Sequence, residues 1–135
     1  MKAYNAKDIR NIAIAGHSGR GKTTLAEAML FLAKATDRLG RVADGNTVLD
    51  FDAEEKRRKV TIATAMAAFD WNNAKINLLD TPGLFDFAGG VSEGMRAAES
   101  ALIVLAAGSG VDVGAEKAYK AASERKIAKL FAVTR

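Results

Sequence analysis

Eight residues near the N-terminus are of the types, and at the spacing, that bind phosphate. The pattern G-x-x-x-x-G-K-[ST] is matched at every fixed position by Gly16-His17-Ser18-Gly19-Arg20-Gly21-Lys22-Thr23. In this pattern backbone N–H groups wrap around phosphate oxygens, the Lys side chain reaches the β- and γ-phosphates, and the last hydroxyl binds Mg²⁺. We therefore predict that these eight residues and the adjacent Thr24 form a nucleotide-binding loop, with Thr23 as a metal ligand.

A second motif, Asp80-Thr81-Pro82-Gly83, follows 58 residues after Lys22. An Asp at the end of a strand can hold the shell of a Mg²⁺ ion, and a Gly just beyond it lets a backbone N–H approach the γ-phosphate. By itself such a sequence is also an ordinary turn. Downstream of a phosphate loop, it predicts that all four residues contribute to nucleotide binding.

Short apolar runs alternate with helical periodicity along the chain, and this alternation is typical of an α/β protein with a mostly parallel sheet. Strands are predicted at 9–15, 60–71, 75–79, 101–106 and 128–133, and helices at 23–35, through 91–98 and at 113–125. The pair Asn72-Asn73 predicts a hairpin, and hence one antiparallel strand. Residues 36–59 show no periodicity, and a connection of this length is usually functional or mobile.

Composition excludes several classes of protein. The chain of 135 residues has the length of one domain and, at 49% hydrophobic residues, enough apolar side chains for a core. It has no Cys and a single His, so disulfide frameworks, thiolate nucleophiles and multi-histidine metal sites are ruled out. The longest apolar run, 101–107, is far below the roughly 20 residues that cross a bilayer, and no signal peptide is recognisable. We expect a soluble, cytoplasmic protein without a membrane partner.

Net charge and the last predicted strand are less restrictive. A net charge of +4 permits an anionic partner without requiring one. The last predicted strand ends two residues before the end of the chain, although helices should cover both faces of a mostly parallel sheet. We expect part of this cover to be missing, and the domain to be incomplete.

The two motifs belong to a wider resemblance. Together with Arg10-Asn11-Ile12, Asp86-Phe87 and Gly110-Val111, they resemble the N-terminal part of the GTP-binding domain of translational GTPases, and among these elongation factor G and its relatives. The resemblance covers nearly the whole chain. It implies a P-loop NTPase fold, a three-layer α/β sandwich in which residues 1–135 provide the phosphate loop, switch I (36–59) and switch II (81–90).

The resemblance also implies ligands and roles. GTP and GDP with Mg²⁺ would be the bound species, and the ribosome, through its RNA and proteins, would be the partner of the full-length factor during translocation, with no role for DNA. The segment 58–62 resembles the one that carries the family's switch Thr, so Thr61 would bind Mg²⁺ and sense the γ-phosphate. Lys22, Thr61 and Gly83 are then the expected catalytic residues, and Thr23, Thr61 and Asp80 the expected metal site.

Position 84 departs from the family pattern. The His that usually follows Pro-Gly, and that is thought to order the attacking water, is replaced by Leu84, whose side chain forms no hydrogen bond. Two hypotheses follow, a GTPase that depends on backbone groups or a partner to order water, and a GTP-binding switch that hardly hydrolyses. A P-loop ATPase is a third, disfavoured by the hairpin and the Asp-Thr-Pro-Gly motif.

Other departures affect the phosphate loop and the base. Gly19 stands where the family often has Asp, and the side chain of Arg20 either contacts phosphate or is solvated. The basic run 56–59 is either a solvated loop or a contact for RNA or nucleotide phosphate. Thr134 and Arg135 stand where the base-reading motif Asn-Lys-x-Asp would begin, so its Asp lies outside the sequence and guanine specificity rests on the resemblance alone.

Overall fold

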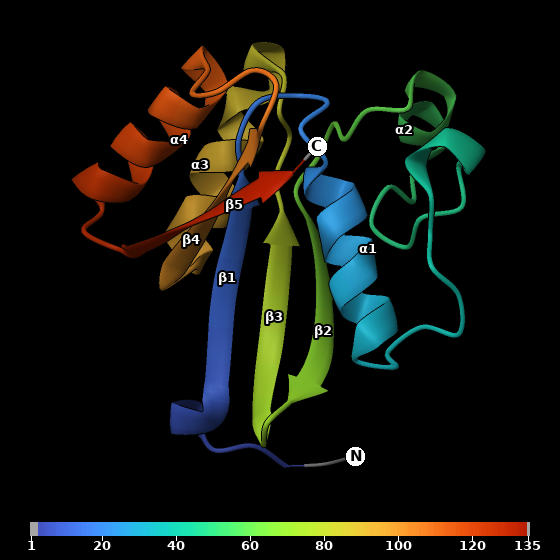
Figure 1. The fold of residues 1–135 in the computed structure, drawn as a ribbon. Helices are drawn as coiled ribbons and strands as arrows, with labels where there is room; N and C mark the ends of the chain where they lie inside the picture. Colours follow the sequence, from blue (N-terminus) through green and yellow to red (C-terminus); the bar gives the residue numbers. More distant parts are fainter. Residues whose placement is uncertain (1–2, 135) are drawn as a thin grey trace.

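The computed structural model describes residues 3–134, which form a five-stranded sheet between two layers of helices (Figure 1). The strands, in the spatial order β2-β3-β1-β4-β5, are β1 (Ile9–Ala15), β2 (Ala65–Trp71), β3 (Ala74–Asp80), β4 (Ser100–Ala106) and β5 (Ala128–Thr134). Only the β2–β3 pair is antiparallel. The prediction of a mostly parallel sheet with one antiparallel strand is confirmed.

Four α-helices cover the sheet or flank it. They are α1 (Lys22–Leu32), α2 (Ala53–Arg58), α3 (Ala88–Ala97) and α4 (Val113–Glu124). Short 3-10 turns occur at Ala6–Asp8, Val42–Asp44 and Phe85–Phe87. Helix α1 lies on one face of the sheet, and α3 and α4 lie on the other (Figure 1). Among residues 3–134, no helix has the length and apolar character needed to cross a bilayer.

Alternate residues of β1 serve the two faces. Ala13 packs in the core under α3 and α4, whereas Ile14 packs in the core under α1, and both are fully buried. The apolar stretch Ala101–Val104 of β4 divides in the same way. A strand buried on both faces needs such a continuous apolar run, which is why its sequence shows no alternation.

Two predicted boundaries were wrong for identifiable reasons. The strand predicted at 60–71 begins only at Ala65, because the N–H groups of Ile62 and Ala63 donate to the Glu55 carboxylate instead of pairing with a strand. The helix predicted at 23–35 ends at Leu32, where Lys34 adopts a left-handed backbone conformation, with φ at 58°, and stops the helix.

The long connection at 36–59 is more ordered than its sequence suggests. Helix α2 begins with a capping box in which Asp52 accepts from Glu54 N at 2.7 Å and Asp52 N donates to Glu55 Oε2 at 3.2 Å. The spacing of Asp52 and Glu55 is a known helix-start signal. Because α2 has only six residues, it is too short for periodicity to detect.

The topology brings the two motifs together. Strands β1 and β3 are neighbours and parallel, so the phosphate loop, which follows β1, and the Asp80 motif, which ends β3, leave the sheet at the same edge. Strands β4 and β5 end at this edge as well. The carboxyl ends of parallel strands are where ligands bind in open α/β sheets.

Candidate functional site

The phosphate loop has a backbone that requires glycine. Gly16, Gly19 and Gly21 have φ angles of 138°, 74° and 82°, which disfavour side chains. A Cβ on Gly16 would lie 2.5 Å from the carbonyl oxygen of Val104. Lys22 begins α1, and its buried ammonium donates back across the loop to His17 O at 3.0 Å. The loop is thus closed over its own lysine, with backbone N–H groups at the N-terminus of α1.

Four buried side chains meet beside this loop. Thr23 Oγ1 donates to Asp80 Oδ2 at 2.6 Å, and Thr61 Oγ1 donates to Asp50 Oδ1 at 2.8 Å. The two hydroxyl oxygens lie 3.0 Å apart. Either hydroxyl can be the donor in this contact, which links the two Thr–Asp pairs into one cluster. The remaining oxygen of Asp80, Oδ1, is buried without a hydrogen-bond partner among the described residues.

Burial sets the charge state of this cluster. Burial raises the pKa of Asp80 to about 7, although the hydrogen bond from Thr23 and the charge of Lys22 act in the opposite direction. Burial also raises the pKa of Asp50 and lowers that of Lys22. Oxygen ligands of this kind, held out of water and short of positive charge, are those that Mg²⁺ prefers. The residues present therefore fit a magnesium ion.

The Asp80 motif packs directly on the phosphate loop. Thr81 donates to Ile14 O through both its N–H at 3.1 Å and its hydroxyl at 2.7 Å. Gly83 O accepts from Ser18 N at 3.1 Å. A Cβ on Gly83 would collide with the Lys22 ammonium and the Ser18 backbone, so only glycine allows this approach. Pro82 is fully buried between them.

A cavity of about 170 Å³ lies over the loop. Of the residues predicted from the sequence, it is lined by Ser18, Gly19, Gly21, Lys22, Thr23, Thr24, Thr61 and Gly83. The other predicted residues are not part of this lining, namely Gly16, His17, Arg20, Asp80, Thr81 and Pro82. Since pockets for whole small ligands are usually about 300 Å³ or more, this cavity suits the phosphates of a nucleotide.

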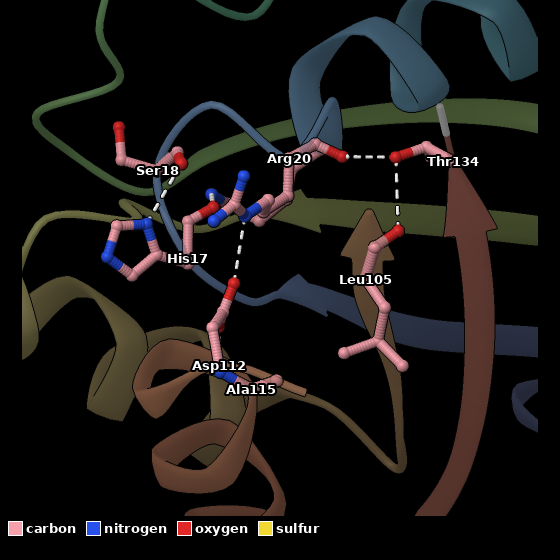
Figure 2. Close-up of polar contacts among 8 residues, drawn as sticks. His17, Ser18, Arg20, Leu105, Asp112, Ala115 and Thr134 are labelled. Atoms are coloured by element: carbon pink, nitrogen blue, oxygen red, sulfur yellow. Dashed lines mark hydrogen bonds and ion pairs between the residues drawn. The ribbon is translucent and has the colours of Figure 1, made fainter. Parts of the chain in front are cut away.

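Arg20 takes a position that neither sequence hypothesis described. Figure 2 shows its side chain directed at Asp112, with Nε 2.8 Å from Oδ2. Asp112 also caps α4 by accepting from Ala115 N at 2.9 Å. The pKa of Asp112 lies below its ordinary value because this N–H and Arg20 together outweigh the effect of burial. The guanidinium is thus engaged in an ion pair with Asp112.

The last strand is tied to the same loop. The hydroxyl of Thr134, at the end of β5, lies 2.8 Å from Arg20 O and 3.1 Å from Leu105 O (Figure 2). His17 bonds locally, with Nδ1 3.0 Å from Ser18 O, and its ring forms a T-shaped contact with the Phe85 ring. These contacts fix the loop to β4 and β5 as well as to β3.

Two of the four cations in the basic run 56–59 pair with one neighbouring acid. Arg57 and Arg58 both pair with Glu54, at 2.6 and 2.5 Å. Lys59 donates to Ala43 O at 2.8 Å and lines the cavity over the phosphate loop. Of the two hypotheses for this run, a phosphate contact is thus compatible with the position of Lys59.

Two buried acids in or near the site were missed. Asp50 reaches Thr61 from a loop without periodicity, so the sequence offers no sign of its position. Glu27 is fully buried on α1 and accepts from Val48 N and Leu49 N. A Glu four residues after Thr23, among apolar helix positions, is the only trace of it in the sequence.

Comparison with known proteins decides the family. Residues 7–135 match the family model of the elongation factor Tu GTP binding domain. The chain belongs to this family of GTP-binding domains. An elongation factor G-like protein of Mycobacterium tuberculosis is 41% identical over 127 residues, which are 94% of this chain and 18% of that protein. The mitochondrial ribosome-releasing factor 2 of Yarrowia lipolytica is 42% identical over 136 residues, 98% of this chain and 17% of the relative.

A solved structure supports the same assignment. A protein from Thermus thermophilus superposes with a TM-score of 0.90 at 38% identity, covering 93% of this chain and 19% of that chain. The GTP-binding-domain fold inferred from the resemblance is therefore confirmed. The chain spans less than a fifth of the length of each of these relatives.

Proposed function

We propose that this GTP-binding domain is the nucleotide switch of an elongation factor G-like translation factor, and that it binds and hydrolyses GTP. The contact network that joins the phosphate loop to both switch segments carries the proposal. Thr23 contacts Thr61 after switch I, and Ser18 contacts Gly83 in switch II. A γ-phosphate above the loop would therefore interact with both segments at the same time.

Each residue has a role that its position supports. Lys22 and the backbone N–H groups from Gly19 to Thr24 would bind the phosphates and offset their negative charge. Thr61 and Gly83 would hold the γ-phosphate while water attacks it. In this sense the catalytic residues are Lys22, Thr61 and Gly83. The nucleobase would be bound by other residues.

Thr23, Thr61 and Asp80 would hold Mg²⁺, with Asp50 as a further oxygen donor. Among residues 3–134, no three His, Cys, Asp or Glu side chains form a metal site by themselves, so phosphate oxygens would complete the set. The ion, when bound, would neutralise charge on the β- and γ-phosphates. The four protein side chains would fix the position of the ion, because all four are buried and hydrogen-bonded.

The named relatives support a partner for this domain. An elongation factor G-like protein and a ribosome-releasing factor are both similar to this chain, which supports the ribosome as the partner that stimulates hydrolysis and translocation as the step served. We place the protein in the cytoplasm, with neither DNA nor a membrane as a partner.

Phosphate release from the longer parent protein tests the proposal. We expect a single turnover of GTP to be accelerated by ribosomes, and GDP but not ATP to compete for the site. A rate equal to that of free GTP, with and without ribosomes, would refute the enzymatic part. Displacement of GTP by ATP as effectively as by GDP would instead support a P-loop ATPase.

A second candidate, a GTP-binding switch with little hydrolysis, is favoured by the position of Leu84. Leu84 lines a separate cavity of about 220 Å³ between α3 and α4, together with Ala88 and Val91, and does not line the cavity over the phosphate loop. Its side chain is thus not part of the cavity proposed to hold the phosphates. Hydrolysis would then depend on groups supplied by the partner.

The substitution Leu84→His separates these candidates. If a side chain at this position can still order water, we expect the ribosome-stimulated rate to rise by about tenfold or more, within the range that a general base contributes. Leu84→Gln, which also forms hydrogen bonds but is a poor base, is the matched control. An unchanged rate in the His variant would show that position 84 has no part in the reaction of this protein.

A further inference from the structure

Glu27 is a fully buried acid outside the set of residues predicted to bind nucleotide. It lies in the middle of α1 with no exposed surface. Its Oε1 accepts from Val48 N at 2.7 Å and from Leu49 N at 3.0 Å, and its Oε2 is buried without a hydrogen-bond partner among residues 3–134. A carboxylate is costly to bury, and here it binds only backbone N–H groups of switch I.

Glu27 shares one face of α1 with Thr23. Glu27 follows Thr23 by four residues, so the two side chains lie on the same face of the helix, one turn apart. Thr23 contacts Thr61, just beyond the end of switch I, and Glu27 binds Val48 and Leu49 within it. One face of α1 therefore holds the switch segment at two separate points.

The backbone that Glu27 holds leads directly to Asp50. Leu49 is 1% exposed and packs in the core under α1 with Leu30. The next residue, Asp50, accepts the Thr61 hydroxyl at 2.8 Å. Displacement of Val48 and Leu49 from Glu27 would thus move Asp50 away from Thr61.

A second part of switch I, at position 40, also packs against the Glu27 carboxylate. Gly40 is buried, and a Cβ added to it would collide with the Glu27 carboxylate and lie 2.9 Å from Thr47 Cα. A glycine at position 40 lets the backbone of switch I lie against the carboxylate. Two parts of switch I, at 40 and at 47–49, are consequently packed around one side chain.

We propose that Glu27 is a positioning residue that anchors switch I to α1 and thereby sets Asp50 and Thr61 for the triphosphate state. The anchor itself is a property of the fold, and its effect on nucleotide preference rests on the proposed function. Loss of the anchor weakens GTP binding more than GDP binding, because Asp50 and Thr61 serve the metal and the γ-phosphate, whereas the phosphate loop alone holds GDP.

Hydrogen exchange in the nucleotide-free protein tests the anchor without reference to nucleotide. We expect Glu27→Ala to speed exchange of the amides in 40–50 by about tenfold or more, since local opening governs their protection. Glu27→Gln keeps an oxygen that accepts both N–H groups and should retain most of the protection. Glu54→Gln, an exposed acid on the same segment, is the control and should change nothing at 40–50.

Gly40→Ala provides an independent variant that leaves Glu27 in place. Its Cβ should displace the carboxylate and raise exchange at Val48 and Leu49, even if Glu27→Ala proves too unstable to study. Wild-type exchange rates at 40–50 in either Glu27→Ala or Gly40→Ala would overturn the anchor.

The effect on nucleotide preference is measured with fluorescent GDP and a non-hydrolysable GTP analogue in the intact protein. We expect Glu27→Ala to raise the Kd of the GTP analogue about tenfold more than the Kd of GDP, and Glu27→Gln to restore most of the difference. Equal losses for both nucleotides would overturn the coupling to Asp50 and Thr61. If the wild type binds neither nucleotide, the proposed function fails, while the exchange experiment still decides whether Glu27 is an anchor.

Discussion

Asp80 is a fully buried carboxylic acid at the end of β3, and its one hydrogen-bond donor is the Thr23 hydroxyl. Burial raises its pKa to about 7. In the absence of a metal ion, the folded protein therefore keeps a proton on Asp80 over a pH range in which the unfolded chain has released it. The ionised form that a cation would bind is disfavoured until a compensating charge arrives.

This shift predicts that the metal-free protein becomes less stable as pH rises. The pKa of Asp80 is higher in the folded than in the unfolded chain, so its contribution is fully present below about pH 4 and is lost as pH rises through about 7. The expected loss is roughly 2–4 kcal/mol. Burial raises the pKa of Asp50 and so adds a change of the same sign. Urea unfolding between pH 5 and 8 in the presence of a chelator measures the slope.

Two variants check the origin of this slope. Asp80→Asn keeps an acceptor for Thr23 but cannot ionise, so it should remove most of the decline. Asp112→Asn is the control, since the pKa of Asp112 is lowered and its titration falls in more acidic solution, outside this range. A slope that survives in Asp80→Asn would show that another group is responsible.

Among single residues, those that belong to a sequence motif could be predicted, whereas those brought to the site by the folding of a loop could not. Lys22, Thr23 and Gly83 are recognisable because the chemistry of phosphate binding fixes their spacing. Asp50 reaches the same site only because Glu27, an acid on another element, holds the preceding backbone. No local pattern encodes that contact, since it depends on how a loop without periodicity folds on α1.

At the scale of elements, two of the three glycines of α3, Gly89 and Gly94, have opposite surroundings. A Cβ on Gly89 would have no neighbour within 4 Å, whereas a Cβ on Gly94 would lie 2.5 Å from Thr81 Cγ2. Glycine costs a helix about 0.5–1 kcal/mol relative to alanine. Gly89→Ala should therefore stabilise the protein by up to about 1 kcal/mol, and Gly94→Ala should destabilise it by about 1–3 kcal/mol through overpacking.

Thermal unfolding of the two variants compares the same substitution in the same helix. A higher Tm for Gly89→Ala and a lower one for Gly94→Ala are expected. Gly94→Ala should also weaken nucleotide binding, because Thr81 lies between β1 and the phosphate loop. Equal changes in Tm would mean that α3 does not pack on Thr81 as closely as the structure indicates.

Helix α2 depends on its N-terminal cap. With six residues it is too short to be stable by itself, and Asp52 and Glu55 satisfy backbone N–H groups at its start. Asp52→Ala should cost about 1 kcal/mol, and Asp52→Asn, which also caps well, should cost only a few tenths. Urea unfolding at neutral pH distinguishes them, and a similar loss for both would point to the charge of Asp52 rather than to its capping bond.

Elements were predicted well where packing follows a period and poorly where it does not. The continuous apolar runs of β1 and β4 follow from burial by helices on both faces, and both strands were confirmed. The segment 60–64 has strand-forming residues but becomes a loop, because Glu55 takes two of its N–H groups and Thr61 faces Thr23. Here a buried side chain overrides the propensity of the backbone.

At the scale of the whole molecule, the two faces of the sheet are covered unequally. Helix α1 covers one face, and beside it lies an apolar cavity of about 470 Å³ that Ile12, Leu102 and Leu130 line. The opposite face is covered by both α3 and α4 (Figure 1). This arrangement agrees with the expectation that part of the helical cover is absent. The expectation rests on the rule that helices shield both faces of a mostly parallel sheet.

The composition of the whole polypeptide also determines which part of a nucleotide the 135 residues can recognise. The cavity over the phosphate loop is lined by Gly19, Gly21, Lys22, Thr23 and Thr61. Thr134 stands where the family's base-reading Asn would be, and its hydroxyl is directed at the backbone oxygens of Arg20 and Leu105. The Asp that would pair with the guanine edge has no counterpart in the sequence.

We therefore predict that the 135-residue polypeptide binds GDP and ADP with Kd values within about tenfold of each other, since binding comes from the phosphates. A site built to hydrogen-bond a base rejects the wrong one by as much as about 10⁴-fold, so the longer parent protein should prefer GDP strongly. Competition against a fluorescent diphosphate measures both ratios, and Lys22→Ala should weaken GDP and ADP alike. A preference for GDP above about a hundredfold in the short polypeptide would mean that residues before position 136 already read the base, with Thr134 the first to test.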